Sequence, residues 1–261
     1  MLAMFRSMRR HKDLLYMLSR RDVTVKYKQS IMGFLWAILM PLLITSAGVL
    51  VKIGLAHVTG TPLRFQDTLS VAVKSVPWAF FVSSIRFSTQ SLAGNAHLVT
   101  KIAFPKAVFP LSAVASQMFD ALIATAVIVV VWIASPVHAG LQVAWVPVLA
   151  LLLLVQVSGL ALLLSAANLF FRDVKYLVEV ILTFAVFFTP VFYDVSLFGQ
   201  HGWVLMLNPV APLLEGLSNA VVRGRAPDLG WTLYSAAVAV LLAVVAPPVF
   251  RQLETKFAES V

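Results

Sequence analysis

The feature that most constrains this chain is a run of twenty-one uncharged residues, 31–51, that directly follows a strongly basic segment, 20–28. About twenty apolar residues in a helix are needed to cross roughly 30 Å of hydrocarbon. Charged side chains enter hydrocarbon only at a high cost, so the basic segment must stay at the membrane surface. The sequence therefore predicts a membrane span with a basic flank.

The whole chain has the composition of an integral membrane protein. It is 60% hydrophobic and only 12% charged, whereas soluble domains carry roughly 25% charged residues. The absence of cysteine excludes disulfides and thiolate metal sites. A cleavable signal peptide would place its apolar run close behind a short basic start. Here residues 1–30 come first, so we expect an uncleaved amino terminus in the cytosol.

Six apolar segments are expected to cross the membrane as helices, which makes the fold class all-α. They are residues 31–51, 69–92, 111–134, 143–170, 176–193 and 229–250. Between the last two, residues 194–228 are rich in Gly and Pro and are predicted to form a helical hairpin or re-entrant element. Within it we expect Asn208 to cap a helix that starts at Pro209, with Leu213 and Leu217 on its apolar face.

Residues 1–30 are predicted to form an amphipathic helix at the membrane interface. Leu14, Leu15 and Leu18 recur at helical spacing, and Lys and Arg occupy other positions. A solvated basic tail remains the alternative.

The distribution of Lys and Arg predicts the orientation of the six spans. The inner segments 1–30, 94–110, 171–175 and 251–261 hold fourteen Lys and Arg residues, and the outer loops hold four. Because positive charge is enriched in cytoplasmic loops, we expect both termini in the cytosol.

Charges inside the spans are the first candidates for a functional role. Arg86 and Asp120 lie about nine and ten residues from the 94–110 loop, so at about 1.5 Å per residue they reach similar depths. We predict a salt bridge between them, which either only pins two helices or contacts a substrate. Lys74 is expected to extend its ammonium group to the outer surface.

Signatures of catalysis are missing from the sequence. It contains no G-x-x-x-x-G-K-[ST] phosphate loop and no H-E-x-x-H metal motif, and its five histidines are well separated. We therefore do not expect an enzyme, a bound metal or ATP hydrolysis in this chain. The aromatic residues fit packing and an interfacial belt, or a path on which sugar rings stack. The path candidates are Trp36, Trp78, Phe81, Phe188 and Tyr193.

Several strings, taken together, carry a family resemblance. The run RRDVTVKYKQSIMGFLWAILMPLL at 20–43 resembles the first signature of the ABC-2 polysaccharide exporter permeases. The matching positions are Arg21, Asp22, Lys26, Tyr27, Ser30, Gly33, Trp36, Pro41 and Leu42. Further matches follow in order: Pro77-Trp78 with Phe80-Phe81, Asn95, LVTKIAFPKAVFP at 98–110, NLFFRDVKYLVEVIL at 168–182, Phe188-Thr189-Pro190-Val191 with Tyr193, and Leu207-Asn208-Pro209.

The resemblance extends over nearly the whole chain and implies a single transmembrane domain, 1–261, in the bacterial inner membrane. It implies a homodimer that works with two separate ATPase subunits, which hold ATP and Mg, and no cofactor in this chain. The implied substrate is a polysaccharide, most simply O-antigen, on undecaprenyl pyrophosphate. Membrane lipids are expected contacts, and nucleic acid is not. The charged residues Lys74 and Arg86 depart from the family pattern.

The resemblance also implies roles for particular residues. The amino-terminal helix and the 94–110 loop would dock the ATPase, and 194–228 would form a periplasmic gate that includes Asn208, Pro209, Leu213 and Leu217. The docking residues in the loop are Asn95, Leu98, Lys101, Phe104, Pro105 and Lys106. Basic residues at the inner surface would meet either the substrate pyrophosphate or anionic lipid headgroups. They are Arg6, Arg9, Arg10, Arg20 and Arg21.

Other functions remain to be weighed against this one. Capsular polysaccharide and teichoic acid are alternative substrates. A secondary transporter would act without an ATPase and usually shows inverted repeats, which we do not find here. A membrane-embedded glycosyl or acyl transferase is disfavoured because acidic residues and histidines are not clustered.

Overall fold

The computed structural model describes residues 12–28, 35–60, 62–101, 104–137 and 140–257, and this part of the chain is built from helices joined by turns and loops, without strands. The expected all-α class is therefore confirmed. In chain order the helices are α2 (Lys12–Lys28), α3 (Leu35–Thr59), α4 (Phe65–Gly94), α5 (Ala96–Lys101), α6 (Val108–Ile133), η1 (Leu141–Trp145), α7 (Val146–Phe170), α8 (Val174–Ala185), η2 (Val195–His201), α9 (Trp203–Met206), α10 (Ala211–Val221) and α11 (Leu229–Glu254).

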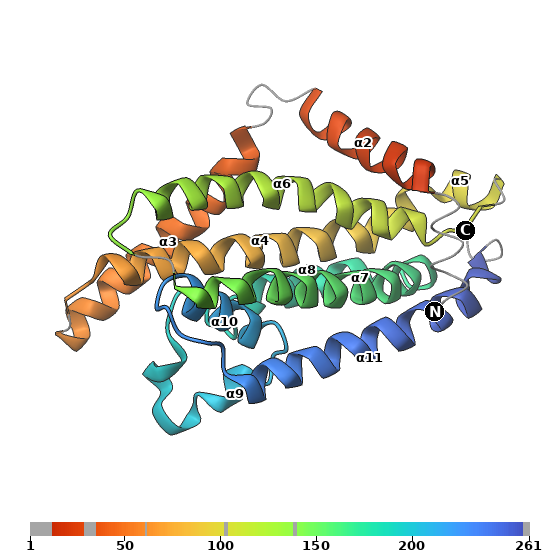
Figure 1. Cartoon of the computed structure of the whole chain (residues 1–261). Coiled ribbons are helices and arrows are strands. Elements are labelled where there is room, and N and C mark those ends of the chain that lie inside the picture. The colour runs from red at the N-terminus through yellow and green to blue at the C-terminus, as the bar shows by residue number, and fades with distance from the viewer. Residues whose placement is uncertain (1–11, 29–34, 61, 102–103, 138–139, 258–261) are drawn as a thin grey trace.

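Five of the described helical segments are long and apolar enough to cross a membrane. They are Ile38–Val58, Phe65–Gly94, Val108–Ile133, Leu141–Phe170 and Leu229–Glu254. Each overlaps one of the predicted spans, namely the first, second, third, fourth and sixth. The protein is a multi-pass membrane protein, and Figure 1 shows its long helices running side by side.

The expected fifth span, 176–193, does not form one helix of spanning length. Helix α8 covers Val174–Ala185, 12 residues, which is about 18 Å long. Residues 186–193 continue as turns. Pro190 lacks the amide hydrogen that a further helical turn needs, and it disfavours helical geometry at Thr189. A proline within an apolar run therefore marks the loss of helix here.

Helix α10 begins two residues later than the sequence predicts. Its first residue is Ala211, its N-cap position is Val210, and Pro212 lies in its first turn. Asn208 acts just before the helix, since its side-chain Oδ1 accepts a hydrogen bond from the Val210 amide at 3.1 Å. The expected cap at Asn208 and start at Pro209 are therefore wrong, although Asn208 does order the turn that leads into α10.

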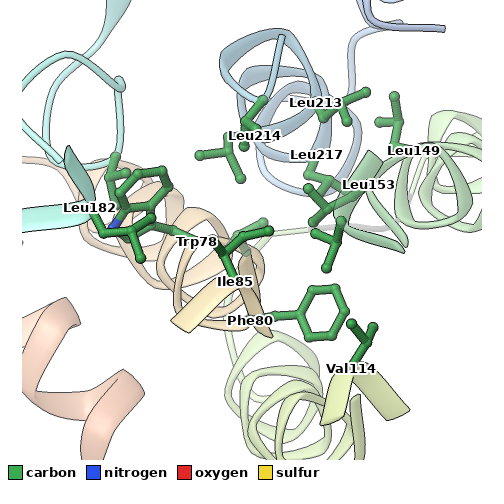
Figure 2. Packing of buried hydrophobic residues seen from close by; sticks show 14 of the residues in the cluster. Trp78, Phe80, Ile85, Val114, Leu149, Leu153, Leu182, Leu213, Leu214 and Leu217 are labelled. Atoms are coloured by element: carbon green, nitrogen blue, oxygen red, sulfur yellow. The ribbon is translucent and has the colours of Figure 1, made fainter. Parts of the chain in front are cut away.

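The main hydrophobic core lies where α4, α7 and α10 meet, with contributions from α6 and α8. Figure 2 shows Trp78 of α4 close to Leu182 of α8, and Leu149 of α7 near Leu213 of α10. Burial of Leu213 and Leu214 is complete. Helix α10 is therefore an internal part of the bundle and is covered by its neighbours.

A second core joins the two ends of the chain. Leu18 of α2 packs with Phe109 of α6, and the same cluster contains Leu92 of α4, Phe250 of α11 and Phe257. The rings of Phe250 and Phe257 meet edge to face, with centroids 5.4 Å apart. Helix α2 and the carboxyl-terminal end of α11 therefore lie at the same end of the bundle (Figure 1).

Helix α2 confirms the predicted helix over the described residues and runs along α6. Leu18 is buried, and the hydroxyl of Ser19 lies 3.5 Å from the carbonyl oxygen of Ser112. Two turns later, the Nζ atom of Lys26 donates to Gln117 at 3.3 Å. The residue numbers rise together on both helices, so α2 and α6 are parallel.

Candidate functional site

The densest group of charges in the described chain surrounds Asp194, and we call Lys52, Lys74, Asp194, Glu215 and Arg223 the Asp194 cluster. Lys74 of α4 is fully buried. Its Nζ lies 3.3 Å from a carboxylate oxygen of Glu215 and 3.6 Å from one of Asp194, and it donates to the carbonyl of Tyr193 at 3.1 Å. The expectation that Lys74 reaches the outer surface is therefore wrong, because two carboxylates hold it inside the bundle.

Asp194, directly after the turns that follow α8, receives the other two cations as well. Lys52 of α3 donates to it at 2.9 Å, and Arg223 donates at 2.6 Å. Burial by itself raises the pKa of Asp194, but the three surrounding cations outweigh burial and lower this pKa to about 2. The carboxylate is therefore held in its charged form.

Arg223 closes the cluster from the segment after α10. Its guanidinium donates to Glu215 at 3.0 Å and to Asn219 at 3.1 Å. Burial lowers the pKa of Arg223, and the carboxylates of Asp194 and Glu215 reverse this effect and raise it. Lys52 also lies 3.8 Å from Asp67. Three cations thus face three carboxylates, and the group ties α10 and its flanks to α3 and α4.

The sequence did not predict this cluster because its members come from distant segments. Lys52 and Arg223 fall in expected outer loops, and Asp194 starts the expected gate segment. The sequence did contain one indication of such a cluster, namely charged residues on apolar segments, because a buried Lys needs an anionic partner. The sequence alone does not identify which carboxylate is the partner of Lys74.

Arg86 and Asp120 do not pair, which corrects the predicted salt bridge. The Nε of Arg86 donates to both carboxylate oxygens of Glu179 on α8, at 2.8 and 2.9 Å. Asp120 instead accepts hydrogen bonds from Lys26 and Tyr27 of α2. Equal depth along two helices does not fix the direction in which each side chain points.

The contact between α2 and Asp120 also affects the pKa of Tyr27. Burial raises the pKa of Tyr27, and the hydrogen bond to the Asp120 carboxylate raises it further. Lys26 lies over the ring of Phe87 on α4, with 5.6 Å between Nζ and the ring centre. Helix α2 is thus linked to both α6 and α4 through polar and aromatic contacts.

The predicted docking residues lie at the end of the bundle that contains the second core. Asn95 caps the end of α4 and accepts a hydrogen bond from Arg21 at 3.4 Å. The backbone amide of Lys106 donates to Glu254 of α11 at 2.7 Å. The ring of Phe104 stacks at a tilt on Phe109, with centroids 5.4 Å apart. Leu98 and Phe104 pack against the second core, Pro105 is half-buried, and Lys101 ends α5.

The predicted phosphate-contacting residues are only partly within the described chain. Arg6, Arg9 and Arg10 lie outside the described residues. Arg20 is exposed on α2, and Arg21 forms an exposed pair with Asp22 at 2.9 Å. The role of these arginines in binding phosphate stays a prediction.

The aromatic residues of the predicted path differ in their exposure. Trp78 is buried in the main core and stacks on Phe81, with ring centroids 5.6 Å apart. Trp36 on α3 and Phe188 after α8 are exposed. Tyr193 donates its hydroxyl hydrogen bond to the carbonyl of Phe187 at 2.7 Å. Trp78 thus acts in packing, and only the exposed members remain able to meet a sugar.

The predicted gate residues hold the connection before α10 in place. The Asn208 side chain donates to the hydroxyl of Thr189 at 2.9 Å. The carbonyl of Pro209 accepts from Ser235 of α11 at 2.8 Å and from Gln156 of α7 at 3.4 Å. Leu213 and Leu217 are buried in the main core, as an apolar face predicts.

An apolar cavity of about 490 Å³ lies between α4, α6 and α7. Its walls include Phe80, Leu122, Trp132 and Leu154. Such a lining suits hydrocarbon and offers a sugar few hydrogen-bonding groups. Within the described residues, no group of three or more His, Asp or Glu side chains is placed to hold a metal ion.

Comparison with known proteins gives relatives of the same length. The O-antigen export system permease protein RfbA of Myxococcus xanthus is 28% identical over 264 residues and is covered completely, as is this chain. Two proteins of the same name from Klebsiella pneumoniae are 28% and 27% identical over 254 residues, which cover 95% of this chain and 94% of each relative. The ABC-2 type transporter profile matches residues 13–222. The chain therefore belongs to the ABC-2 type transporter family and is a membrane transport component rather than an enzyme.

Proposed function

We propose that this chain is the permease subunit of an ATP-driven exporter that moves a lipid-linked polysaccharide across the bacterial inner membrane. The polysaccharide is O-antigen. The observation that carries the proposal is the match over the full chain to the Myxococcus xanthus O-antigen export permease. The chain would form one transmembrane domain, residues 1–261. Its substrate would be carried on undecaprenyl pyrophosphate.

Six membrane crossings fit the arrangement of the helices. Because α2 and the end of α11 share the second core, the chain between them must cross the bundle an even number of times. Five segments are of spanning length, and α8 with the turns up to 193 supplies the sixth crossing. The excess of Lys and Arg at the end that holds the second core supports a cytosolic position for both termini.

A second copy of the chain would cover apolar surface on α3 and α8. Met40 and Leu43 of α3 are about half exposed, and Val180, Ile181 and Phe184 of α8 are more than half exposed. Both helices contact α4. A homodimer that joins such faces would place a path for the glycan between two copies, with exposed rings such as Phe188 available for stacking.

A separate ATPase would supply the energy. The sequence has no phosphate loop, so two ATPase subunits would hold ATP and Mg. The residues around α5 and Lys106 would dock these subunits, since they lie beside α2 and the end of α11. ATP binding favours one permease arrangement only if the docking contacts differ between the two arrangements.

The segment 194–228 would form the periplasmic gate. Helix α10 lies towards the opposite end of the bundle from the second core (Figure 1), and it carries Glu215 of the Asp194 cluster. Opening this gate would require α10 to move relative to α3 and α4. The ion pairs of Lys52, Lys74 and Arg223 are the contacts that such a movement would change.

Deletion and copurification test the proposal. A strain that lacks this chain is expected to lose surface polysaccharide and to accumulate the lipid-linked glycan inside. The chemistry of the accumulated glycan distinguishes O-antigen from capsule and teichoic acid. The tagged chain is expected to copurify with an ATPase. Intact surface polysaccharide together with no ATPase overturns the proposal, and transport by the purified chain without ATP would show a secondary transporter.

A further inference from the structure

Within the described chain, Arg86 of α4 forms side-chain hydrogen bonds through one of its guanidinium nitrogens. Its Nε donates to both carboxylate oxygens of Glu179. Among the described residues, neither terminal nitrogen of Arg86 donates a hydrogen bond. A guanidinium group has five N–H donors, so most of the donors of Arg86 remain available. The Arg86 side chain is 41% exposed and that of Glu179 is 38% exposed.

Lys74, a cation on the same helix, is satisfied in a different way. It is fully buried, and Glu215, Asp194 and the carbonyl of Tyr193 surround its ammonium group. Charges within membrane spans are costly, and they are usually paired or functional. Arg86 has one carboxylate partner and an exposed side. A further polar or anionic group on that exposed side would accept the remaining hydrogen bonds of the Arg86 guanidinium group.

The surface around Arg86 is polar over about two helical turns. Ser83 lies three residues before Arg86 and Gln90 lies four residues after it, so all three share one face of α4. On α8, Thr183 follows Glu179 by four residues. Gln90 and Thr183 are exposed. Such a polar stripe on otherwise apolar spans suits a polar ligand better than acyl chains.

The position along α4 places Arg86 near the level of lipid headgroups. Helix α4 has 30 residues and is about 45 Å long, longer than roughly 30 Å of hydrocarbon. Arg86 lies eight residues before the last residue of α4, Gly94, or about 12 Å from the inner end. A second cation is close to this level, because Lys26 lies over the ring of the next residue, Phe87, at 5.6 Å.

We propose that Arg86, positioned by Glu179, binds a phosphate group of an amphiphile through its free terminal nitrogens. Arg matches the planar geometry of phosphate oxygens and forms charge-assisted hydrogen bonds with them. The ligand is the diphosphate of the lipid-linked substrate as it enters from the cytosolic leaflet. This assignment rests on the proposed function and adds a residue of α4 to the basic residues expected to meet the substrate pyrophosphate.

The two members of the pair affect phosphate binding in opposite directions. Arg86→Gln removes the donors and weakens binding. Glu179→Gln keeps the guanidinium, removes the anion that competes with phosphate, and strengthens binding. A pair that only joins α4 to α8 would respond to both changes in the same direction.

The test measures binding to the whole chain in phosphatidylcholine nanodiscs, without an ATPase. The probes are farnesyl diphosphate and farnesol, and the variants are Arg86→Gln, Glu179→Gln, the double variant and Arg225→Gln. Arg225 is an exposed residue after α10 and serves as the control. The double variant leaves no unpaired charge, so it protects the test against misfolding of the single variant.

We expect Arg86→Gln and the double variant to weaken diphosphate binding by about tenfold or more, Glu179→Gln to strengthen it, and Arg225→Gln to leave it unchanged. Equal affinities for farnesyl diphosphate and farnesol, or an unchanged affinity in the folded double variant, overturn the site. If phosphatidylglycerol competes as well as farnesyl diphosphate, the ligand is a bulk lipid headgroup and the substrate assignment is wrong. The proposed export function is tested separately by deletion and stands or falls on surface polysaccharide.

Discussion

The ammonium group of Lys74 lies 3.3 Å from a carboxylate oxygen of Glu215, and this pair joins α4 to α10 in the interior of the bundle. Lys74 is fully buried and Glu215 is nearly so. A buried ion pair is costly to break, because the remaining charge is left in a medium of low polarity. The position of α10 therefore depends on side chains that the main hydrophobic core does not contain.

Replacing Lys74 should destabilise the protein strongly. We expect Lys74→Met to lower the free energy of unfolding by about 3–5 kcal/mol, since Glu215 and Asp194 each lose one of their cations inside the bundle. The double variant Lys74→Met/Glu215→Gln should recover part of this loss. Thermal unfolding in detergent measures both, with Arg225→Gln as an exposed control. Unfolding of Lys74→Met at the wild-type temperature would show that the ion pair is not needed to hold α10.

The stability that Asp194 provides should be lost at acid pH. The pKa of Asp194 is lowered from 3.8 to about 2 in the folded chain, so folding favours its charged form. Its contribution is complete above 3.8 and is lost as the pH falls towards 2. We expect the difference in Tm between the wild type and Asp194→Asn to shrink over this range.

The exposed acid on α2 provides a matched control for Asp194. Asp13→Asn should give only a small difference in Tm, because this side chain is exposed. If the difference for Asp194→Asn is constant between pH 3.8 and 2, the three cations do not hold its carboxylate in the charged form.

Asp120 should be energetically coupled to Lys26 and independent of Arg86. In a double-mutant cycle, Asp120→Asn and Lys26→Gln should show an interaction energy of about 0.5 kcal/mol or more, because their side chains are in contact. The cycle of Asp120→Asn with Arg86→Gln should be additive within experimental error. Thermal unfolding of the six proteins decides between them, and the reverse pattern would restore a bridge between α4 and α6.

Charge reversal at the docking loop should uncouple ATP hydrolysis from export. We expect Lys101→Glu/Lys106→Glu to leave the permease dimer assembled while export of polysaccharide falls strongly, because the expected ATPase contact changes sign. Surface polysaccharide and size-exclusion chromatography are the measurements. Arg225→Glu, at the other end of the bundle, should leave export unchanged. Normal export by the double variant would move the docking surface elsewhere.

The length of apolar runs was enough to predict five of the spans. It failed for 176–193, where the composition is apolar but Pro190 and the turns around it end the helix at Ala185. Local turn chemistry also shifted the start of α10, since the cap lies at Val210 and not at Asn208. Hydropathy measures how apolar a segment is and carries little information about where the backbone hydrogen bonds stop.

Pairing between charges was harder to predict than their depth. Arg86 and Asp120 lie on neighbouring helices, yet they point to α8 and α2 respectively. The partner of Lys74 is supplied by a helix that follows it at long range in the sequence. The rotation of each helix about its axis determines where its side chains point. This rotation is set by packing in the assembled bundle, so it cannot be deduced from the sequence of one helix alone.

The Asp194 cluster also sets an order of events during synthesis. Lys74 and Glu215 are separated by 141 residues in the chain, so at roughly 5–20 residues per second Lys74 exists for roughly 7–28 seconds before its partner is made. During this time Lys52 and Lys74 are present without Asp194 and Glu215. The ammonium groups of the nascent protein must therefore lie near water or phospholipid headgroups during this time. Helix α10 can pack against α4 only after Asp194 and Glu215 have been synthesised.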